Sequence, residues 1–127
     1  SKRPRMAAAA ERHADRVIIT SDNPRTENPT AIIAEVASGL SRPDAATREV
    51  DREAAIEQAI AEARPDDVIV IAGKGHETEQ ILPDGAGGTR RIHLDDAEIA
   101  RRALEARAAP IVRTRAQQTG SSAGRSP

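Results

Sequence analysis

The chain has 127 residues, with no Cys, Phe, Trp or Tyr, and its 19 Lys and Arg nearly balance 20 Asp and Glu. This length suits one domain, and the net charge of -1 argues against nucleic acid or an anionic membrane as a partner. Without cysteine, disulfides and thiolate metal sites are excluded, and the three scattered His are poor zinc ligands. No apolar run approaches the ~20 residues that span a bilayer, and no signal peptide is evident, so we expect a cytoplasmic protein.

The apolar core must be built from small side chains. Ile, Leu and Val together number 22, a share low enough that disorder is an alternative. Balanced charge and clear hydrophobic periodicity up to about Leu104 nevertheless indicate a folded chain. The segment from Pro110 onward is polar and lacks periodicity. We therefore predict a domain over residues 1–109 and a disordered polar tail over 110–127.

The first half of the chain predicts alternating helices and strands. An alanine-rich helix over 6–14 precedes a short buried strand over 17–19. Asn28 and Pro29 then supply an N-cap and a first helical residue for a helix that ends near Ser38. Residues 47–50 form a possible short strand.

In the second half, Asp51 caps a helix that Pro65 ends. Residues 68–72 are apolar on both faces, which predicts a strand of a parallel sheet covered by helices on both sides. Two short runs around a glycine-rich turn, 81–82 and 91–93, predict a hairpin. A last helix begins at Asp95 or Asp96, both of which we expect to be capping residues, and reaches about residue 107.

This alternation predicts an α/β domain with an open, mostly parallel, Rossmann-like sheet and helices on both faces. In such sheets ligands bind beyond the carboxyl ends of the strands, where helix N-termini point outward. The stretch "SDNPR" follows the strand at 17–19, and "GKGHE" follows the strand at 68–72. One crevice could therefore be lined by both stretches.

The side chains of these stretches suit an amino-acid ligand. Arg25 offers a planar fork for a carboxylate, and Asn23 offers a donor and an acceptor. Gly73 and Gly75 allow a ligand close to the backbone, and Glu77 can accept a hydrogen bond from an ammonium group. Together they predict a pocket for a molecule with both carboxylate and amine groups.

Each motif also has a purely structural interpretation. "SDNPR" is typical of a capped turn with a solvated arginine. "GKGHE" does not meet the phosphate-loop pattern, and His76 is favoured as a loop residue over a catalytic base. Lys2 and Arg3 could contact phosphate or be solvated terminal charges.

Taken together, "SKRPRM", "TSDNPRTENP", "VIVIAGKGHETEQ" and "HLDD" resemble the C-terminal domain of Mur ligases, most closely the members that add meso-diaminopimelate. The resemblance covers about residues 1–108. It implies that Asp22, Asn23, Pro24 and Arg25 form the recognition element for diaminopimelate, and that Gly73 and Glu77 belong to a second binding loop. It implies no catalytic residue within this chain.

The resemblance also implies a reaction, in which diaminopimelate is joined to UDP-N-acetylmuramoyl-L-alanyl-D-glutamate in peptidoglycan synthesis. ATP and Mg²⁺ are the cofactors, bound mainly by two other domains that are absent here. Because the sequence begins with Ser1 inside a motif, we expect a fragment that is inactive alone. Two alternatives are a ligase for another amino acid such as lysine, and a free-standing, noncatalytic binding module.

Overall fold

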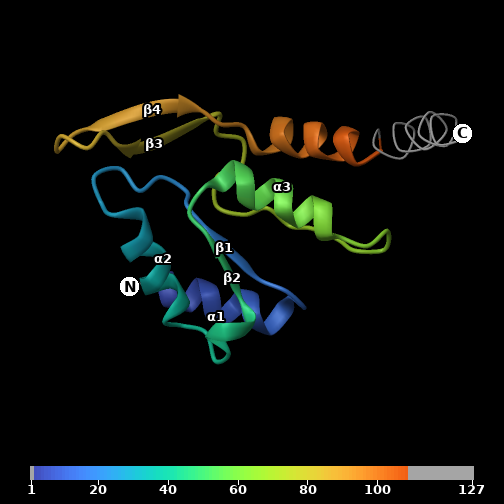
Figure 1. Ribbon diagram of the computed structural model, residues 1–127. Coiled ribbons are helices and arrows are strands. Elements are labelled where there is room, and N and C mark those ends of the chain that lie inside the picture. Colours follow the sequence, from blue (N-terminus) through green and yellow to red (C-terminus); the bar gives the residue numbers. More distant parts are fainter. Residues whose placement is uncertain (1, 109–127) are drawn as a thin grey trace, which may run out of the picture.

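The computed structural model describes residues 2–108 (Figure 1). A further helix runs from residue 96 to 108, at the end of the described part. The other elements, in chain order, are α1 (Arg3–His13), β1 (Ile18–Thr20), α2 (Pro29–Ala37), the 3-10 helix η1 (Pro43–Ala45), β2 (Thr47–Glu49), α3 (Arg52–Glu62), β3 (Glu79–Pro83) and β4 (Thr89–His93).

Helix starts follow the capping residues of the sequence. The Asn28 side chain accepts hydrogen bonds from the first-turn amides of α2, and the Asp51 side chain accepts one from the amide of Ala54 in α3. Asp95 accepts from the amides of residues 97 and 98 and so caps the last helix. The helix predicted over 6–14 is confirmed but begins at Arg3, because Pro4 is tolerated in a first helical turn. The predicted tail, 110–127, lies outside the described residues.

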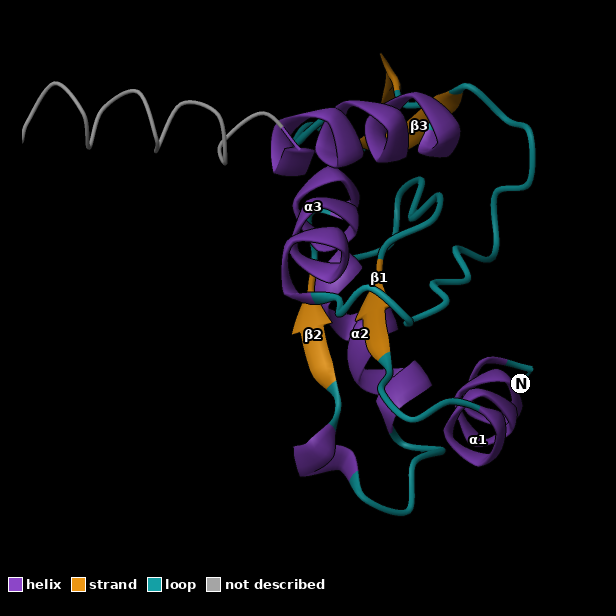
Figure 2. Ribbon diagram, turned by 90° about the vertical axis from the view of Figure 1, so that its right-hand side faces the viewer, coloured by secondary structure: helices purple, strands orange, loops and turns teal. Residues whose placement is uncertain are grey.

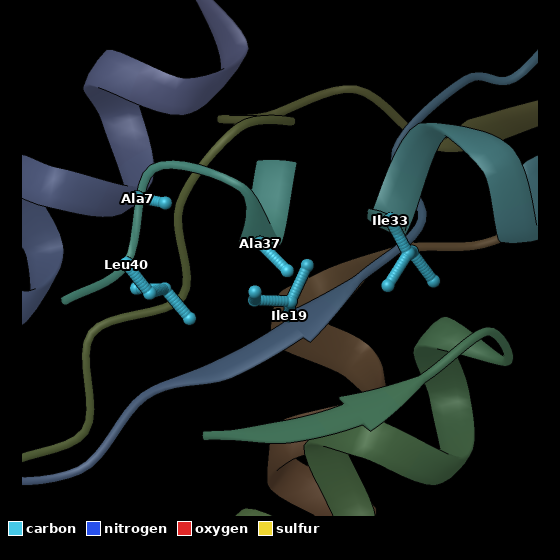
Figure 3. Close-up of a cluster of buried hydrophobic side chains, with 5 residues drawn as sticks. All are labelled: Ala7, Ile19, Ile33, Ala37 and Leu40. Atoms are coloured by element: carbon cyan, nitrogen blue, oxygen red, sulfur yellow. The ribbon is translucent and has the colours of Figure 1, made fainter. Parts of the chain in front are cut away.

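β1 and β2 form a parallel pair (Figure 2). In its register, Ile19 lies opposite Arg48. Both α2 and α3 contact the pair, and α1 packs on α2. Ile19 points toward α2, as Figure 3 shows. The buried members of this first cluster are Ala7, Ile19, Ile33, Ala37 and Leu40. Burying each isoleucine here contributes about 1.5–3 kcal/mol.

A second apolar cluster lies between α3 and the last helix. Its buried members are Ile56, Ile60, Leu94 and Ile99. The hairpin of β3 and β4 is antiparallel, as predicted, with Gln80 opposite Ile92. At the base of the hairpin, the amide of Leu94 donates to the carbonyl of Thr78 at 2.8 Å, which continues the pairing of the two strands. α3 thus contacts the parallel strands and also carries half of the second cluster.

The strand predicted over 68–72 is wrong. These residues form no strand with any described segment, and Val68 and Val70 are 88% and 81% exposed. Only Ile71 packs against the second cluster. A run that is apolar on both faces requires a covering layer on each side, and the described part of the chain supplies one side only. The α/β class is confirmed, but the parallel sheet of the described residues has two strands.

No helix within residues 2–108 is long and apolar enough to cross a membrane.

Candidate functional site

The first loop, residues 21–28, leaves β1 through a strained backbone. Arg25 has φ of 55°, and it is the one residue other than glycine with positive φ in the described part of the chain. Its amide donates to the carbonyl of Ile81 at 3.0 Å, and the amide of Glu27 closes a turn on Pro24 at 3.0 Å. For a residue with a β-carbon this conformation costs about 1–2 kcal/mol. Such strain is typical of functional loops, where the surrounding structure holds it in place.

The second loop, residues 73–78, lies beside the first. Gly73 and Gly75 have φ of 110° and 61°, which glycine adopts without steric cost. A β-carbon added to Gly73 would lie 3.8 Å from Oδ2 of Asp22. The sequence predicted that both stretches would meet at the ends of two strands. They do meet, although only the first follows a strand.

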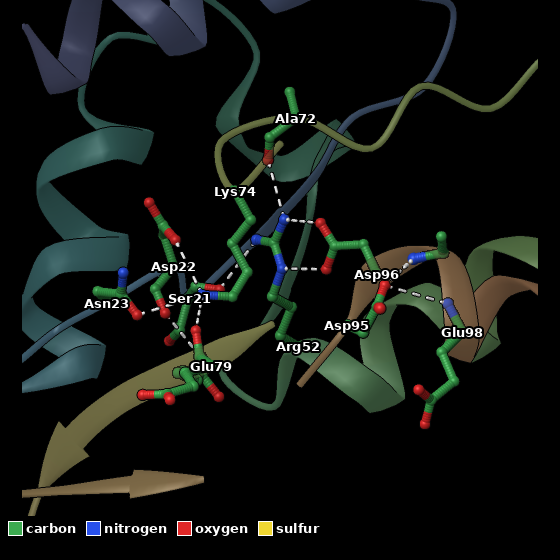
Figure 4. A network of polar contacts seen from close by, with 12 residues as sticks. Ser21, Asp22, Asn23, Arg52, Ala72, Lys74, Glu79, Asp95, Asp96 and Glu98 are labelled. Atoms are coloured by element: carbon green, nitrogen blue, oxygen red, sulfur yellow. Dashed lines mark hydrogen bonds and ion pairs between the residues drawn. The ribbon is translucent and has the colours of Figure 1, made fainter. Parts of the chain in front are cut away.

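Lys74 joins the two loops, and sequence reasoning assigned it no role. Its side chain is fully buried. Nζ donates to Oδ1 of Asn23 at 3.2 Å and to the backbone carbonyl of Glu79, and it lies 3.7 Å from Oδ1 of Asp22 (Figure 4). A buried ammonium is stable only where oxygens replace its water, and these oxygens provide that environment.

The contacts of Asn23 fix the direction of its side-chain amide. Oδ1 accepts from both Lys74 Nζ and the amide of Ile81, the latter at 3.0 Å. Two donors on one oxygen identify the other terminal atom as the NH₂ group, which points away from Lys74 in Figure 4. Asn23 therefore offers the NH₂ group of its side chain as a hydrogen-bond donor to a ligand bound at this loop.

Apart from the buried Lys74, the charged groups of the two loops are open to solvent. Asp22, Arg25, His76 and Glu77 are all exposed, whereas Pro24 is buried. Behind them, buried Gln80 donates to the carbonyl of Asp22 at 2.8 Å. The site is thus a pair of exposed, charged loops on a rigid, hydrogen-bonded base.

Arg3 is held by carboxylates of the protein itself. Its guanidinium pairs with Glu27 at 2.9 Å and with Glu35 at 3.2 Å. The hydrogen bond to Glu27 raises the pKa of Arg3 and lowers that of the Glu27 carboxyl. Lys2 is exposed just before α1. A phosphate contact of Lys2 or Arg3 stays a prediction.

Asp96 does not cap the last helix, contrary to prediction. Its carboxylate is buried and binds Arg52 through two hydrogen bonds, of 2.8 Å to Nε and 2.7 Å to Nη2. Asp95 alone provides the cap. Two adjacent acids have the same capping propensity in the sequence, so pairing with an arginine 44 residues away was not evident.

The comparison with known sequences places this arrangement in a family. The profile described as "Mur ligase, glutamate ligase domain" matches residues 1–75, more than half of the chain, including the first loop and the start of the second. The chain belongs to the Mur ligase family. The resemblance found in the sequence motifs is confirmed.

Individual Mur ligases are similar to this chain over more residues than the family profile covers. The chain is 56% identical over 106 residues to UDP-N-acetylmuramoyl-L-alanyl-D-glutamate--2,6-diaminopimelate ligase of Prochlorococcus marinus (strain MIT 9313), and 45% identical over 103 residues to that of Coxiella burnetii (strain RSA 493 / Nine Mile phase I). These matches cover 84% and 81% of this chain but 20% of each relative. A solved structure of the same-named ligase superposes with a TM-score of 0.74 at 40% identity, covering 84% of this chain and 21% of that one. The chain therefore spans about a fifth of the length of these Mur ligases.

Proposed function

We propose that this chain is the amino-acid-binding, C-terminal part of a ligase that adds meso-diaminopimelate to UDP-N-acetylmuramoyl-L-alanyl-D-glutamate in peptidoglycan synthesis. The observation that carries the proposal is the donor character of the first loop. The NH₂ group of Asn23 and the guanidinium of Arg25 lie two residues apart, and both can only donate. A ligand group that accepts several hydrogen bonds, such as a carboxylate, fits them.

The adjacent loops also offer acceptors for amines. Asp22 and Glu77 are exposed carboxylates on the first and second loop, and the ammonium of Lys74 lies 3.7 Å from the carboxylate of Asp22. A carboxylate near Arg25 and an ammonium near Glu77 describe the distal end of diaminopimelate. Lysine lacks that carboxylate, so it would leave the guanidinium of Arg25 without an ionic partner.

The role of such a domain is to position a nucleophile. Binding one end of diaminopimelate would direct the amine of the other end at an activated carboxyl. The reaction between them would then proceed from a fixed geometry and not from a chance bimolecular encounter. No residue of this chain needs to transfer a proton for that purpose. We expect the chain alone to be inactive.

ATP and Mg²⁺ would be bound mainly outside this chain, in the remainder of a cytoplasmic enzyme. Within residues 2–108 there is no group of three or more His, Cys, Asp or Glu side chains suited to a metal ion. The described residues therefore do not fit a Mg²⁺ site of their own.

The test is the amino-acid specificity of the full-length protein. Wild type should form product with meso-diaminopimelate and not with L-lysine, and Arg25→Met should raise KM for diaminopimelate by at least 100-fold while KM for ATP stays constant. Arg91→Met, which removes an exposed ion pair with Glu79, is the matched control. Preference for lysine would instead indicate a ligase of different specificity. Binding of diaminopimelate without any product would support a noncatalytic module.

A further inference from the structure

Arg52, the first residue of α3, is a buried cation with partners on three segments. Its exposed fraction is 3%. Besides the two hydrogen bonds to Asp96, Nη1 donates to the carbonyl of Ser21 at 3.0 Å and Nη2 to the carbonyl of Ala72 at 3.1 Å (Figure 4). Four of the five guanidinium donors are thus used inside the protein.

The two carbonyls lie where the binding loops begin. Ser21 directly precedes Asp22, and Ala72 directly precedes Gly73. Because residues 68–72 form no strand with β1, no backbone ladder among the described residues sets the distance between these points. The guanidinium bridges them instead, with Nη1 on the carbonyl of Ser21 and Nη2 on that of Ala72.

Asp96 makes this bridge possible in two ways. It neutralises a charge that burial would otherwise penalise heavily, and its bidentate contact fixes the plane of the guanidinium. Lysine could not replace Arg52, because a single ammonium has three donors and no fixed fork. The geometry of this site depends on arginine specifically.

We propose that Arg52 and Asp96 are positioning residues, which set the spacing of the two loops so that both charged ends of one amino-acid ligand are bound at once. This proposal rests on the function proposed above. It extends that function to a pair of residues that contact no ligand and act through the backbone of Ser21 and Ala72.

The test combines amide hydrogen exchange with kinetics on the full-length protein. In Arg52→Lys, exchange should rise at least tenfold in both loops and stay at the wild-type rate in α1 and α2. KM for meso-diaminopimelate should rise about 10- to 100-fold with KM for ATP unchanged. Asp96→Glu, which keeps the ion pair but displaces the guanidinium, should show a smaller change of the same kind. Arg102→Lys, in an exposed pair with Glu98 on the last helix, is the matched control.

The outcomes separate the two proposals. Unchanged exchange and unchanged KM in Arg52→Lys would overturn the positioning role and leave the proposed function intact. Equal exchange increases in the loops and in α1, or failure of both variants to fold, would also overturn it, since the pair would then support the whole fold. If wild type shows no dependence on diaminopimelate but both loops loosen selectively, the proposed function fails and the loop spacing by Arg52 is supported.

Discussion

The side chains of Lys74 and Asn23 are joined by a hydrogen bond of 3.2 Å, although 51 residues separate them in the chain. This contact connects the two loops through their side chains. It also determines which end of the Asn23 amide faces outward, and hence which ligand group the first loop can accept.

Replacing Lys74 by methionine tests this relationship. The variant leaves one donor on Oδ1 of Asn23 and removes the ammonium that also donates to the Glu79 carbonyl, so the amide of Asn23 loses its fixed direction. Loss of a buried hydrogen-bond partner costs about 1–3 kcal/mol, and we expect KM for meso-diaminopimelate to rise about 5- to 150-fold. Steady-state kinetics of the full-length protein measures this, with Arg91→Met as the control. An unchanged KM would show that Asn23 is oriented without Lys74.

We expect Arg25 to lower the free energy of unfolding through its strained backbone while its side chain binds diaminopimelate. Glycine adopts φ of 55° without strain, whereas alanine does not, so Arg25→Gly should be more stable than Arg25→Ala by about 1 kcal/mol. Both variants should lose recognition of diaminopimelate equally, because both lack the guanidinium. Urea unfolding gives the stabilities, and calorimetric titration gives the affinities. Equal stability of the two variants would mean that the loop relaxes once the arginine is removed.

Gly39 allows close packing of α1 against the end of α2. A β-carbon at Gly39 would lie 1.9 Å from the carbonyl oxygen of Pro4, so the two backbones would have to separate. Gly39→Ala should lower the free energy of unfolding by about 1–3 kcal/mol. In the hairpin turn, Gly87 has φ of 87°, and an added β-carbon there would meet no atom beyond its chain neighbours within 4 Å, so Gly87→Ala measures backbone strain without crowding. A loss at Gly39 no greater than that at Gly87 would contradict the close contact.

Glu11 makes the N-terminal half sensitive to acid. Its carboxylate accepts from the amides of Ser41 and Arg42 at 2.8 and 2.9 Å, and these hydrogen bonds hold its pKa below the ordinary value of 4.5. The carboxyl thus favours folding fully above pH 4.5, and its contribution is lost as the pH falls through the lowered pKa. Wild type should exceed Glu11→Gln in stability at pH 6, and the difference should narrow toward pH 3. NMR titration of Glu11 with a midpoint at 4.5 or above would contradict this.

The sequence predicted most of the local structure because its signals are local. The caps Asn28 and Asp51 and the apolar periodicity after them depend on neighbours within one or two helical turns. The prediction for 68–72 failed because it inferred pairing from composition. Which strand lies beside another is a property of the whole fold, and apolar residues on both faces do not determine it.

The residues of the candidate site were predicted from the sequence only in part, because only some of them belong to a local motif. The family motif pointed to Asp22, Arg25 and Glu77, which are exposed and carry the charges. The buried Arg52 and Lys74 beneath them were missed, because their partners are backbone carbonyls and side chains distant in the sequence, which no local pattern identifies. Lys74 offered a weak signal, since it is one of two lysines in an arginine-rich chain and lies inside the motif.

The exposed valines at 68 and 70 affect how this chain would behave in a test tube. The segment is outside any strand of the described residues and exposes branched apolar side chains, so another molecule can add to it. At high concentration the purified chain should therefore self-associate through this segment while its helices are still folded. The rate of self-association would then depend on the protein concentration, so diluting the sample would slow it.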